Sequence, residues 1–408
     1  MSRLANYIKQ HVPDGVEYRT LAELGTWTGG ITPSKGNPKY WERGTVPWVT
    51  SMDISATGGS EIRGLVSEAA LRETSLRLVT GPSIAVVMRS NVLRRFLPIG
   101  YIGIATSMNQ DLRLLTPIDG IDARYVFWVL RADSERIRRA CVRTDGSMAA
   151  VNSKAFFEWR IPVPPLVVQR EIAALLDAFA RLEADLGAAL EAEREGRRVQ
   201  ASHYRDRLLS FDQDIEWSTL GEIAEYTNGK AHERLVSDEG DVPLVTARFI
   251  SRNGEANRFV QLKDVLTPAS VGDTALVLSD LPNGRALART FFVDRDAAYA
   301  INQRIARIRV RDTGRVAPRF LFHVLNRNPG LLKYDNGSDQ THLSKGQVTG
   351  LAFPLPPLPE QERIARILDR LAPLVEDLAE TLDAERETRR QQFEYYRDKL
   401  LTFKEAAG

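Results

Sequence analysis

The chain contains the same sequence pattern twice, about 190 to 200 residues apart. EYRTLAELGTWTGG, which begins at Glu17, matches EWSTLGEIAEYTNG from Glu216, and VPWVTSMDIS from Val46 matches VPLVTARFIS from Val242. From residue 164 to residue 211 the first copy aligns with the second without a gap, at a constant offset of 192. A repeat this long indicates a duplicated domain rather than a solenoid. It favours two similar modules related by a pseudo-twofold axis; the alternative is a duplication that serves only stability.

Size and composition fit several globular modules, since 408 residues are too many for one ordinary domain. No run of about 20 apolar residues is present to cross a bilayer, and the first residues lack the apolar core of a signal peptide. We therefore expect a cytoplasmic protein. The single cysteine, Cys141, can form neither an internal disulfide nor a thiolate zinc site, and we expect it to be a buried, unreactive thiol.

Charge is distributed unevenly between the two halves. Residues 15–164 carry 19 Lys and Arg against 14 Asp and Glu, whereas residues 212–357 carry 18 against 18. The excess positive charge therefore belongs to the first half. A weak excess of this kind permits DNA binding without demonstrating it.

Two long amphipathic helices are predicted after the proline-rich segments at residues 162–165 and 354–359, because apolar residues then recur at steps of three and four. The first is expected at residues 168–210, about 43 residues and roughly 65 Å long. Pro357 and Pro359 suit a first helical turn. Pro373 falls inside the second helix and predicts a kink there.

Each apolar stripe needs a partner, and the two stripes match, so we predict that the helices pair as an antiparallel coiled coil. Such pairing would place the preceding modules tens of ångströms apart, over DNA half-sites separated by about one helical turn or less. The charged distal segments from Glu191 and Asp383 are either solvated or a docking surface. The predicted coiled-coil and subunit-docking residues are Gln169, Ile172, Leu175, Leu176, Phe179, Leu182, Leu186, Gln361, Ile364, Ile367, Leu368, Leu371, Leu374 and Leu378.

The segments between the helices consist of short apolar runs separated by Gly, Pro, Asn and Asp, which indicates strands and turns, with one short helix per module at residues 123–139 and 318–326. Trp48 and Trp128 are expected to pack in module cores. The fold class is mixed α/β, with two similar globular modules separated by two long antiparallel helices. The expected parts are residues 1–164 (an N-terminal arm and module 1), 165–211 (a helix), 212–357 (module 2) and 358–404 (a helix).

Three pairs of loops offer the polar side chains that contact base edges: residues 29–41 with 228–235, the loop from 89 with that from 279, and 143–154 with 334–345. For each residue the alternative is an ordinary solvated surface position. The DNA-binding candidates in module 1 are Lys35, Asn37, Lys39, Arg89, Ser90, Asn91, Arg94, Arg95, Ser147, Asn152 and Lys154. Those in module 2 are Lys230, Arg234, Ser279, Asn283, Arg285, Ser338, Gln340, Thr341 and Lys345.

PLPPLPEQERIARIL and its fainter copy VPPLVVQREIAALL each follow an Asn-Gln pair and a GS-x(6)-K loop. They resemble the conserved regions of the specificity (S) subunit of type I restriction-modification systems, and PDGVEYRTLAELG resembles the start of that family's first recognition domain. The resemblance covers essentially the whole chain. The first copy departs from the pattern, with Val167 and Val168 where the second has Pro359 and Glu360, so its helix start is less well defined.

The resemblance implies two target-recognition domains joined by two conserved helices, each domain binding one half of a bipartite double-stranded DNA target. The helices would set the spacer and dock two methyltransferase (modification) subunits around residues 169–190 and 361–382. These subunits bind S-adenosylmethionine and methylate adenine, and restriction subunits with ATP-driven translocation can join them. No cofactor, metal or membrane is expected on this chain.

Other functions are weaker interpretations of the sequence. NPKY at Asn37 differs from the NPPY-like element of amino-methyltransferases at Lys39, and neither a glycine-rich nucleotide turn nor a phosphate-binding P-loop is present. The five histidines, His11, His203, His232, His323 and His342, include no pair at metal-ligand spacing. We therefore expect a non-catalytic subunit. A coiled-coil scaffold without sequence-specific DNA binding stays open, and DNA retention at moderate salt discriminates the two.

Overall fold

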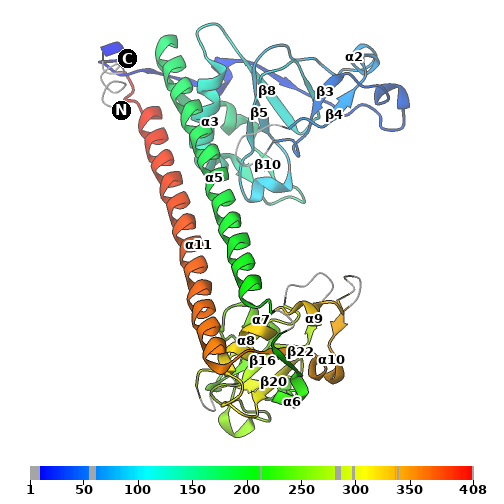
Figure 1. Cartoon of the computed structure of the whole chain (residues 1–408). Helices are drawn as coiled ribbons and strands as arrows, with labels where there is room; N and C mark the ends of the chain where they lie inside the picture. The colour runs from blue at the N-terminus through cyan, green and yellow to red at the C-terminus, as the bar shows by residue number, and fades with distance from the viewer. Residues whose placement is uncertain are drawn as a thin grey trace. The chain divides into compact units, whose positions relative to one another are not determined.

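The computed structural model describes residues 10–54, 61–211, 214–280, 286–295, 299–335, 337 and 340–406. The chain divides into two compact units. Unit 1 is Met1–Leu190 with Ala384–Gly408, and unit 2 is Glu191–Asp383. Each unit therefore combines one of the two modules with a part of each long helix (Figure 1).

Module 1 is built on an antiparallel four-stranded sheet whose centre is fully buried. Every residue of β5, Ser83–Val87, is buried, because α3 and other elements pack against the sheet. Module 1 also contains a three-stranded sheet, whose strands alternate along the chain with those of the first sheet. The strand orders are β2 (Gly25–Gly29), β8 (Leu112–Pro117), β5, β6 (Ile99–Ile102), and β4 (Gly64–Val66), β3 (Val46–Val49), β7 (Ser107–Met108); β1 (Glu17–Thr20) pairs with β11 (Arg160–Val163), and β9 (Val142–Arg143) with β10 (Ala150–Val151).

Module 2 repeats the four-stranded sheet, the three-stranded sheet and the β1–β11 pair strand for strand, which confirms that the sequence repeat is a duplicated domain. In both modules the middle strand of the three-stranded sheet is antiparallel to one neighbour and parallel to the other. The strand orders are β13 (Ala224–Asn228), β20 (Ile305–Val310), β16 (Thr274–Val277), β18 (Thr290–Phe292), and β15 (Phe259–Val260), β14 (Val242–Val245), β19 (Ala300–Ile301); β12 (Glu216–Thr219) pairs with β22 (Ala352–Leu355), and β17 (Ser279–Asp280) with β21 (Thr341–His342).

The predicted short helices are confirmed as α3 (Ala123–Cys141) and α8 (Pro318–Leu325). Asp122 caps α3 by accepting a hydrogen bond from the Tyr125 N–H at 2.9 Å. Trp48, Trp128 and Cys141 are buried, as expected. The other short helices are η1 (Leu21–Leu24), η2 (Pro38–Tyr40), α2 (Glu68–Glu73), η3 (Asn91–Arg94) and α4 (Ser153–Phe157) in module 1, and α6 (Leu220–Ile223), η4 (Glu233–Leu235), α7 (Ala247–Ser251), η5 (Leu262–Asp264), α9 (Pro329–Leu332) and α10 (Lys345–Thr349) in module 2.

The two long helices are α5 (Leu166–Leu208) and α11 (Leu358–Leu401). α5 begins two residues before the predicted residue 168 and ends two before residue 210. α11 has Pro359 in its first turn and continues through Pro373. The kink predicted at Pro373 stays a prediction.

Within each unit the helices run antiparallel. In unit 1, Leu176 of α5 shares a core with Leu400 and Leu401 of α11, and Gly187 lies beside Arg386. Advancing along α5 thus means moving back along α11. In unit 2 the Arg194 guanidinium is 3.7 Å from the Asp383 carboxylate, and Leu208, later on α5, packs against the core that contains Leu368, earlier on α11. The predicted antiparallel pairing is therefore confirmed within each unit.

In the first turns of each helix the apolar stripe also packs against the module, which the sequence did not predict. Ile172 and Leu176 belong to the core of module 1, and Ile364 and Leu368 to that of module 2. The stripe therefore begins as a module contact, because each helix starts inside its module. Residues packed partly against the cores are Leu175 and Leu371; half-buried ones are Phe179, Leu186 and Leu378; exposed ones are Leu182 (63%), Ile367 (38%) and Leu374 (64%).

Candidate nucleic-acid interface

Three segments leave the central sheet of module 2 at one edge, which we call the loop edge. There β13 ends at Asn228, β16 ends at Val277 and β20 begins at Ile305, and the register pairs Val277 with Ile305. The segments from residues 229, 278 and before 305 therefore lie together. Sequence analysis nominated the first two but not the Asn-Gln turn that precedes β20.

Module 1 has the same loop edge. β2 ends at Gly29, β5 ends at Val87 and β8 begins at Leu112, where Val87 pairs with Leu112. The Met88 and Arg89 N–H groups both donate to the Asp111 carbonyl. The duplicated scaffold therefore brings equivalent loops together in both modules.

The third predicted loop joins the second at this edge. In module 1 the Arg94 guanidinium donates to the carbonyl oxygens of Thr144 (3.1 Å) and Gly146 (2.9 Å). In module 2, β17 pairs with β21, and the Gln340 Nε2 donates to Ser279 Oγ at 3.0 Å. The sequence did not predict this association, which depends on residues about 50 to 60 positions apart.

The long helix is anchored at the opposite end of the sheet in module 2. Gln361, 1% exposed, accepts a hydrogen bond from the Ala317 N–H (2.9 Å) and donates to the carbonyls of Arg315 (3.0 Å) and Pro356 (2.8 Å). Arg315 and Ala317 follow the last residue of β20, Val310, which lies a strand's length from the loop edge.

Gln169 makes the equivalent bonds in module 1. Its side chain is fully buried, accepts from the Asp122 N–H (2.8 Å) and donates to the carbonyls of Gly120 (3.0 Å) and Pro164 (2.7 Å). Gly120 and Asp122 follow the end of β8 at Pro117. Both glutamines therefore attach a helix to a module, and in each module the loop edge faces away from that attachment.

A cavity of about 280 Å³ lies at the loop edge of module 2. Arg248, Arg258 and Arg304 line it, and none of the three has an ion-pair partner within the part of the chain that the structure describes. Unpaired guanidinium groups bind phosphate oxygens and the O6 and N7 acceptors of guanine. The sequence pattern did not predict these three arginines as DNA-binding residues, although Arg304 directly follows the repeated Asn-Gln pair.

Glu233 lines the same cavity, and two amides hold it in place. Asn302 Nδ2 and Gln303 Nε2 each donate to Glu233 Oε1 at 3.1 Å. Desolvation by partial burial raises the pKa of Glu233, but these hydrogen bonds, together with one from its own backbone N–H and the charge of His232, lower it, and the net pKa is lowered. The side chain is therefore an ionised, acceptor-only group at neutral pH.

The backbone around Glu233 is fixed by its neighbours. His232 is fully buried; its Nε2 accepts from the Leu266 N–H at 2.9 Å, and its Nδ1 lies 2.7 Å from the Lys230 carbonyl, so Nδ1 is the protonated nitrogen. A Cβ on Gly229 would lie only 2.0 Å from the Asn302 carbonyl oxygen, so only glycine allows this close approach. The scaffold thus presents Glu233 in a set position.

Module 1 carries different side chains at the equivalent places. Asp111 follows its Asn-Gln pair and binds Arg89 Nε at 2.9 Å and Asn109 Nδ2 at 3.2 Å, while Gln110 Oε1 accepts from Thr32 Oγ1 at 2.6 Å. By the alignment of VPWVTSMDIS with VPLVTARFIS, Met52 stands where module 2 has Arg248, and Met52 is 91% exposed. The arginine cluster is therefore specific to module 2.

Several predicted DNA-binding residues also hold the fold together, and their contact with DNA stays a prediction. Ser279 is 4% exposed in β17. Loop formation uses short polar side chains as caps and bonds charged ones locally. The engaged residues are Asn37, Ser90 and Asn152 (caps of η2, η3 and α4), Lys39 (paired with Glu73), Arg89 (Asp111), Arg94 (backbone carbonyls), Gln340 (Ser279) and Thr341 (Asp335).

The remaining predicted residues that the structure describes are accessible. Lys154 lies 4.0 Å from Glu158, and Lys345 lies 5.9 Å from the centre of the Tyr226 ring. Asn283, Arg285 and Ser338 lie outside the described residues. The exposed candidates whose side chains have no partner among the described residues are Lys35, Asn91, Arg95, Ser147, Lys230 and Arg234. Their contact with DNA stays a prediction.

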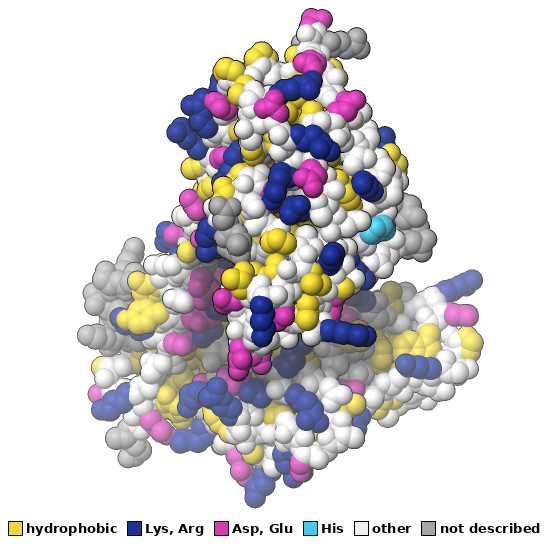
Figure 2. All heavy atoms as spheres, turned by 90° about the horizontal axis from the view of Figure 1, so that it is seen from below, with side chains coloured by type: hydrophobic (Ala, Val, Ile, Leu, Met, Phe, Trp, Pro, Cys, Tyr) yellow, Lys and Arg dark blue, Asp and Glu magenta, His cyan; other side chains and the backbone are white. Residues whose placement is uncertain are grey.

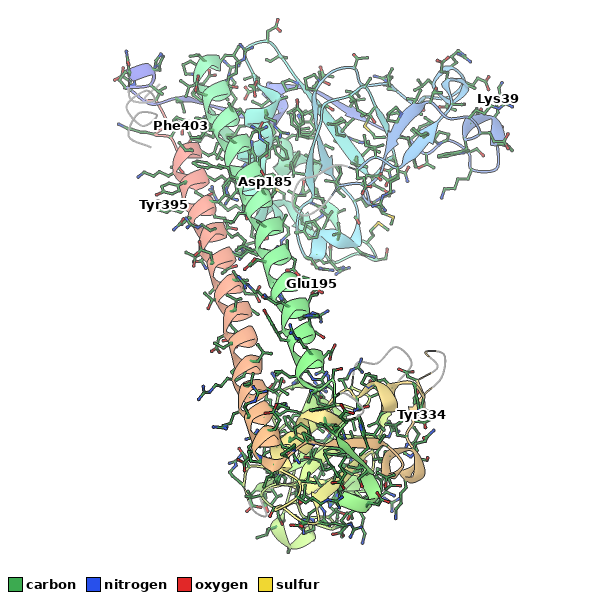
Figure 3. The ribbon with its side chains drawn as sticks, in the orientation of Figure 1. Lys39, Asp185, Glu195, Tyr334, Tyr395 and Phe403 are labelled. Atoms are coloured by element: carbon green, nitrogen blue, oxygen red, sulfur yellow. The ribbon has the colours of Figure 1, made fainter. Side chains whose placement is uncertain are left out.

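The surface carries no broad patch of one charge on the face drawn in Figure 2, where Lys and Arg alternate with Asp and Glu. Figure 3 shows Lys39 on the part of module 1 farthest from α5. Placement of individual side chains, rather than net charge, therefore distinguishes the loop edges.

None of the helices in the described ranges has the apolar length that a bilayer span requires, and no described cluster of His, Cys, Asp and Glu could hold a metal ion.

A comparison with protein families matches residues 13–193 and 212–385 to the type I restriction modification DNA specificity domain. The chain belongs to this family. It is 36% identical over 196 residues to the EcoR124I/EcoR124II specificity subunit of Escherichia coli, covering 48% of each chain. It is 31% identical over 232 residues to the EcoprrI specificity subunit, also from Escherichia coli, covering 53% of this chain and 56% of that one. The chain thus spans about half the length of these relatives.

Two solved structures share the fold. A chain described in work on complex assembly and conformational transition of the type I R-M system superposes with a TM-score of 0.76 over 96% of this chain and 98% of that one. The HsdS subunit from Thermoanaerobacter tengcongensis gives 0.57 over 96% and 97%. Both are 17% identical, so the likeness concerns the fold.

Proposed function

We propose that this chain is the sequence-specific DNA-binding specificity subunit of a type I restriction-modification complex, and that each module binds one half of a bipartite double-stranded target. The observation that carries this is the loop edge: a duplicated scaffold gathers three polar loops on the side of each module away from its helix. The loops differ in chemistry while the scaffold is kept, as recognition of two different half-sites requires. Family membership supports the same function.

We further propose that the chain itself is not catalytic and acts in the cytoplasm. Its relatives are named specificity subunits, and the charged groups at its loop edges are suited to contact DNA rather than to transfer a methyl group or cleave a phosphodiester. S-adenosylmethionine and ATP would then be bound by the modification subunits and by any restriction subunits.

The helix pair offers a docking surface in unit 1. A groove of about 320 Å³ is lined by apolar side chains from both helices, among them Phe179 and Leu182 of α5 and Phe393 and Tyr396 of α11. Leu182 is 63% exposed, and its repeat equivalent in unit 2, Leu374, is 64% exposed. Exposed leucines at matched positions favour a partner present in two copies. We propose that these faces dock two modification subunits.

Methylation mapping tests the DNA-binding function. The full chain would be produced with its modification subunits in a host that lacks adenine methylation, and methylated sites would be sequenced. We expect one asymmetric bipartite motif, and replacing residues 212–350 by another recognition domain should change one half only. A scaffold without DNA specificity would give no motif and no DNA retention at moderate salt. A change in both halves would contradict two independent modules.

The docking surface is tested separately. Leu182→Asp and Leu374→Asp should each weaken binding of one modification subunit, because a carboxylate cannot be desolvated in an apolar contact. Leu262→Asp, at a residue of η5 that is 59% exposed, is the matched control. Unchanged stoichiometry in both helix variants would contradict docking at these positions.

A further inference from the structure

We infer that module 2 recognises the exocyclic amino group of a cytosine or adenine through Glu233, while Arg248, Arg258 and Arg304 contact the phosphates of the same half-site. The inference rests on the proposed function and names the chemistry that one module selects. It follows from the cavity at the loop edge, where one carboxylate is held among three cations.

Glu233 has the properties of a base-reading group. The two amide donors fix its orientation at Oε1, and a carboxylate can accept about four hydrogen bonds, so acceptor capacity remains for a ligand. In the major groove, cytosine N4 and adenine N6 are donors, whereas guanine O6 and N7 and thymine O4 are acceptors that a carboxylate repels. A fixed, ionised Glu233 therefore distinguishes amino-bearing base edges from the others.

The surrounding arginines are free to bind an external anion. Elsewhere the chain pairs exposed arginines locally, as in Arg197 with Glu193 on α5. The three cavity arginines form no such pair with Glu233 or with any other described carboxylate. A phosphate would be attracted to the arginines and repelled by Glu233, which places the backbone at the rim and a base edge at the carboxylate.

A second polar group supports a ligand at this cavity. Asn302 is 7% exposed, and its Oδ1 has no hydrogen-bond partner among the described residues. A buried acceptor without a partner costs about 1 to 3 kcal/mol, so such groups are rare unless something else satisfies them. Its twin in module 1, Asn109, has no such orphaned oxygen, since it accepts from the Asp111 N–H at 3.1 Å.

The first test changes the carboxylate. In the assembled complex, Glu233→Gln should relax or shift one position in one half of the methylation motif, because Asn302 and Gln303 would hold the glutamine oxygen and leave its NH2 group, a donor, facing the base. We expect a loss of about 10-fold in binding preference at that position. Glu239→Gln, an exposed glutamate of the same loop region, is the matched control and should leave the motif unchanged.

The second test changes the DNA. In duplex oligonucleotides that carry the mapped motif, the base at that position is replaced by a purine or pyrimidinone analogue that lacks the exocyclic amine. The analogue should weaken binding of the unaltered protein about 10-fold and have no further effect on the Glu233→Gln variant. Equal weakening of both proteins would overturn the role of Glu233.

The third test concerns the arginines. Arg248→Ala, Arg258→Ala and Arg304→Ala should each weaken binding to cognate and unrelated DNA alike. Each should reduce the magnitude of the negative slope of log K against log salt by up to about 0.9. Arg311→Ala is the control, since Arg311 follows the far end of β20. Unchanged slopes in all three variants would overturn the phosphate contacts.

The outcomes separate the inference from the function beneath it. If the unaltered complex yields no motif, the proposed function fails. If it yields a bipartite motif that Glu233→Gln leaves intact, only the inference fails. Should Glu233→Gln lower the melting temperature, Glu233→Asp replaces it: this variant keeps an acceptor, so base identity should persist with weaker binding, and a changed base would overturn the inference.

Discussion

Module 1 has the larger count of positive residues, yet module 2 has the larger number of available arginines at its loop edge. Residues 15–164 carry 19 Lys and Arg against 14 Asp and Glu, and residues 212–357 carry 18 against 18. In module 1, however, Arg89 binds Asp111 and Arg94 binds backbone carbonyls. Net charge therefore overestimates the cations that module 1 can offer and hides those of module 2, because pairing is decided by geometry.

The attachment of each module to its helix is, by contrast, nearly the same in both copies. Asp177 of α5 accepts from Trp128 Nε1 at 2.8 Å, and its repeat equivalent Asp369 of α11 lies 2.8 Å from His323 Nε2. Chain duplication kept the contact and changed the donor. The two modules thus agree where they must be held and differ where they face a ligand.

The largest expected effect tests the shared attachment. Gln169→Leu and Gln361→Leu each leave three buried or partly buried backbone groups without this partner and should lower the free energy of unfolding of their unit by about 3 to 5 kcal/mol. Denaturant unfolding of the full chain measures this. The exposed twins Gln200→Leu and Gln392→Leu are controls. A large loss in only one unit would break the equivalence of the two attachments.

The next effect should occur in module 2 alone. Asp273 is 1% exposed and accepts from Arg309 Nε (2.7 Å) and from the Ser270 N–H (2.8 Å). It directly precedes β16, and the residue that directly precedes the equivalent strand β5 in module 1 is Pro82, which cannot form these bonds. Asp273→Asn should destabilise unit 2 by about 2 to 3 kcal/mol, less than a fully buried pair because Arg309 is partly exposed. Hydrogen exchange should show faster opening of β16 and unchanged β5. Equal changes in both strands would contradict local action.

A smaller effect distinguishes the two ring donors by pH. Burial lowers the pKa of His323 below 6.5; the hydrogen bond and charge of Asp369 act in the opposite direction, and Arg319 and Arg205 add to the lowering. A lowered folded-state pKa means that the unfolded state binds the proton more readily, so this stability is present above pH 6.5 and is lost as pH falls below it.

Exchange rates of the α8 amides, corrected for intrinsic pH dependence, should therefore rise below pH 6.5, while those of α3, which carries Trp128, should not respond to this group. His323→Gln should remove the response, and His203→Gln, at an exposed residue of α5, should leave it. A response that persists in His323→Gln would assign the pH dependence to another residue.

The smallest expected effect is a gain in module 1. Met52→Arg places a guanidinium at the exposed position equivalent to Arg248. It should increase the magnitude of the negative slope of log K against log salt by up to about 0.9 and slightly tighten binding to any DNA. Ile118→Arg, at an exposed position after the far end of β8, is the control. If both variants bind DNA equally, the loop edge of module 1 is no closer to DNA than its opposite end.

Local sequence patterns were sufficient to predict the duplication, the two long helices and the short helices α3 and α8. These depend on local patterns: apolar periodicity, prolines at helix starts and caps such as Asp122 act within a few residues. The sequence also indicated the three loop pairs, because turn residues interrupt the apolar runs. No pattern of this kind indicates what a stripe or loop contacts.

The contacts that these elements make depend on how each module packs in three dimensions. This packing placed Ile172 and Ile364 in module cores, buried Ser279 in a strand, and paired Arg89 while leaving Arg304 without a partner among the described residues. These outcomes depend on residues far apart in the chain, which strand register brings within hydrogen-bonding distance. Local periodicity specifies which face of an element is apolar, whereas the packing of the whole module specifies which neighbour that face meets.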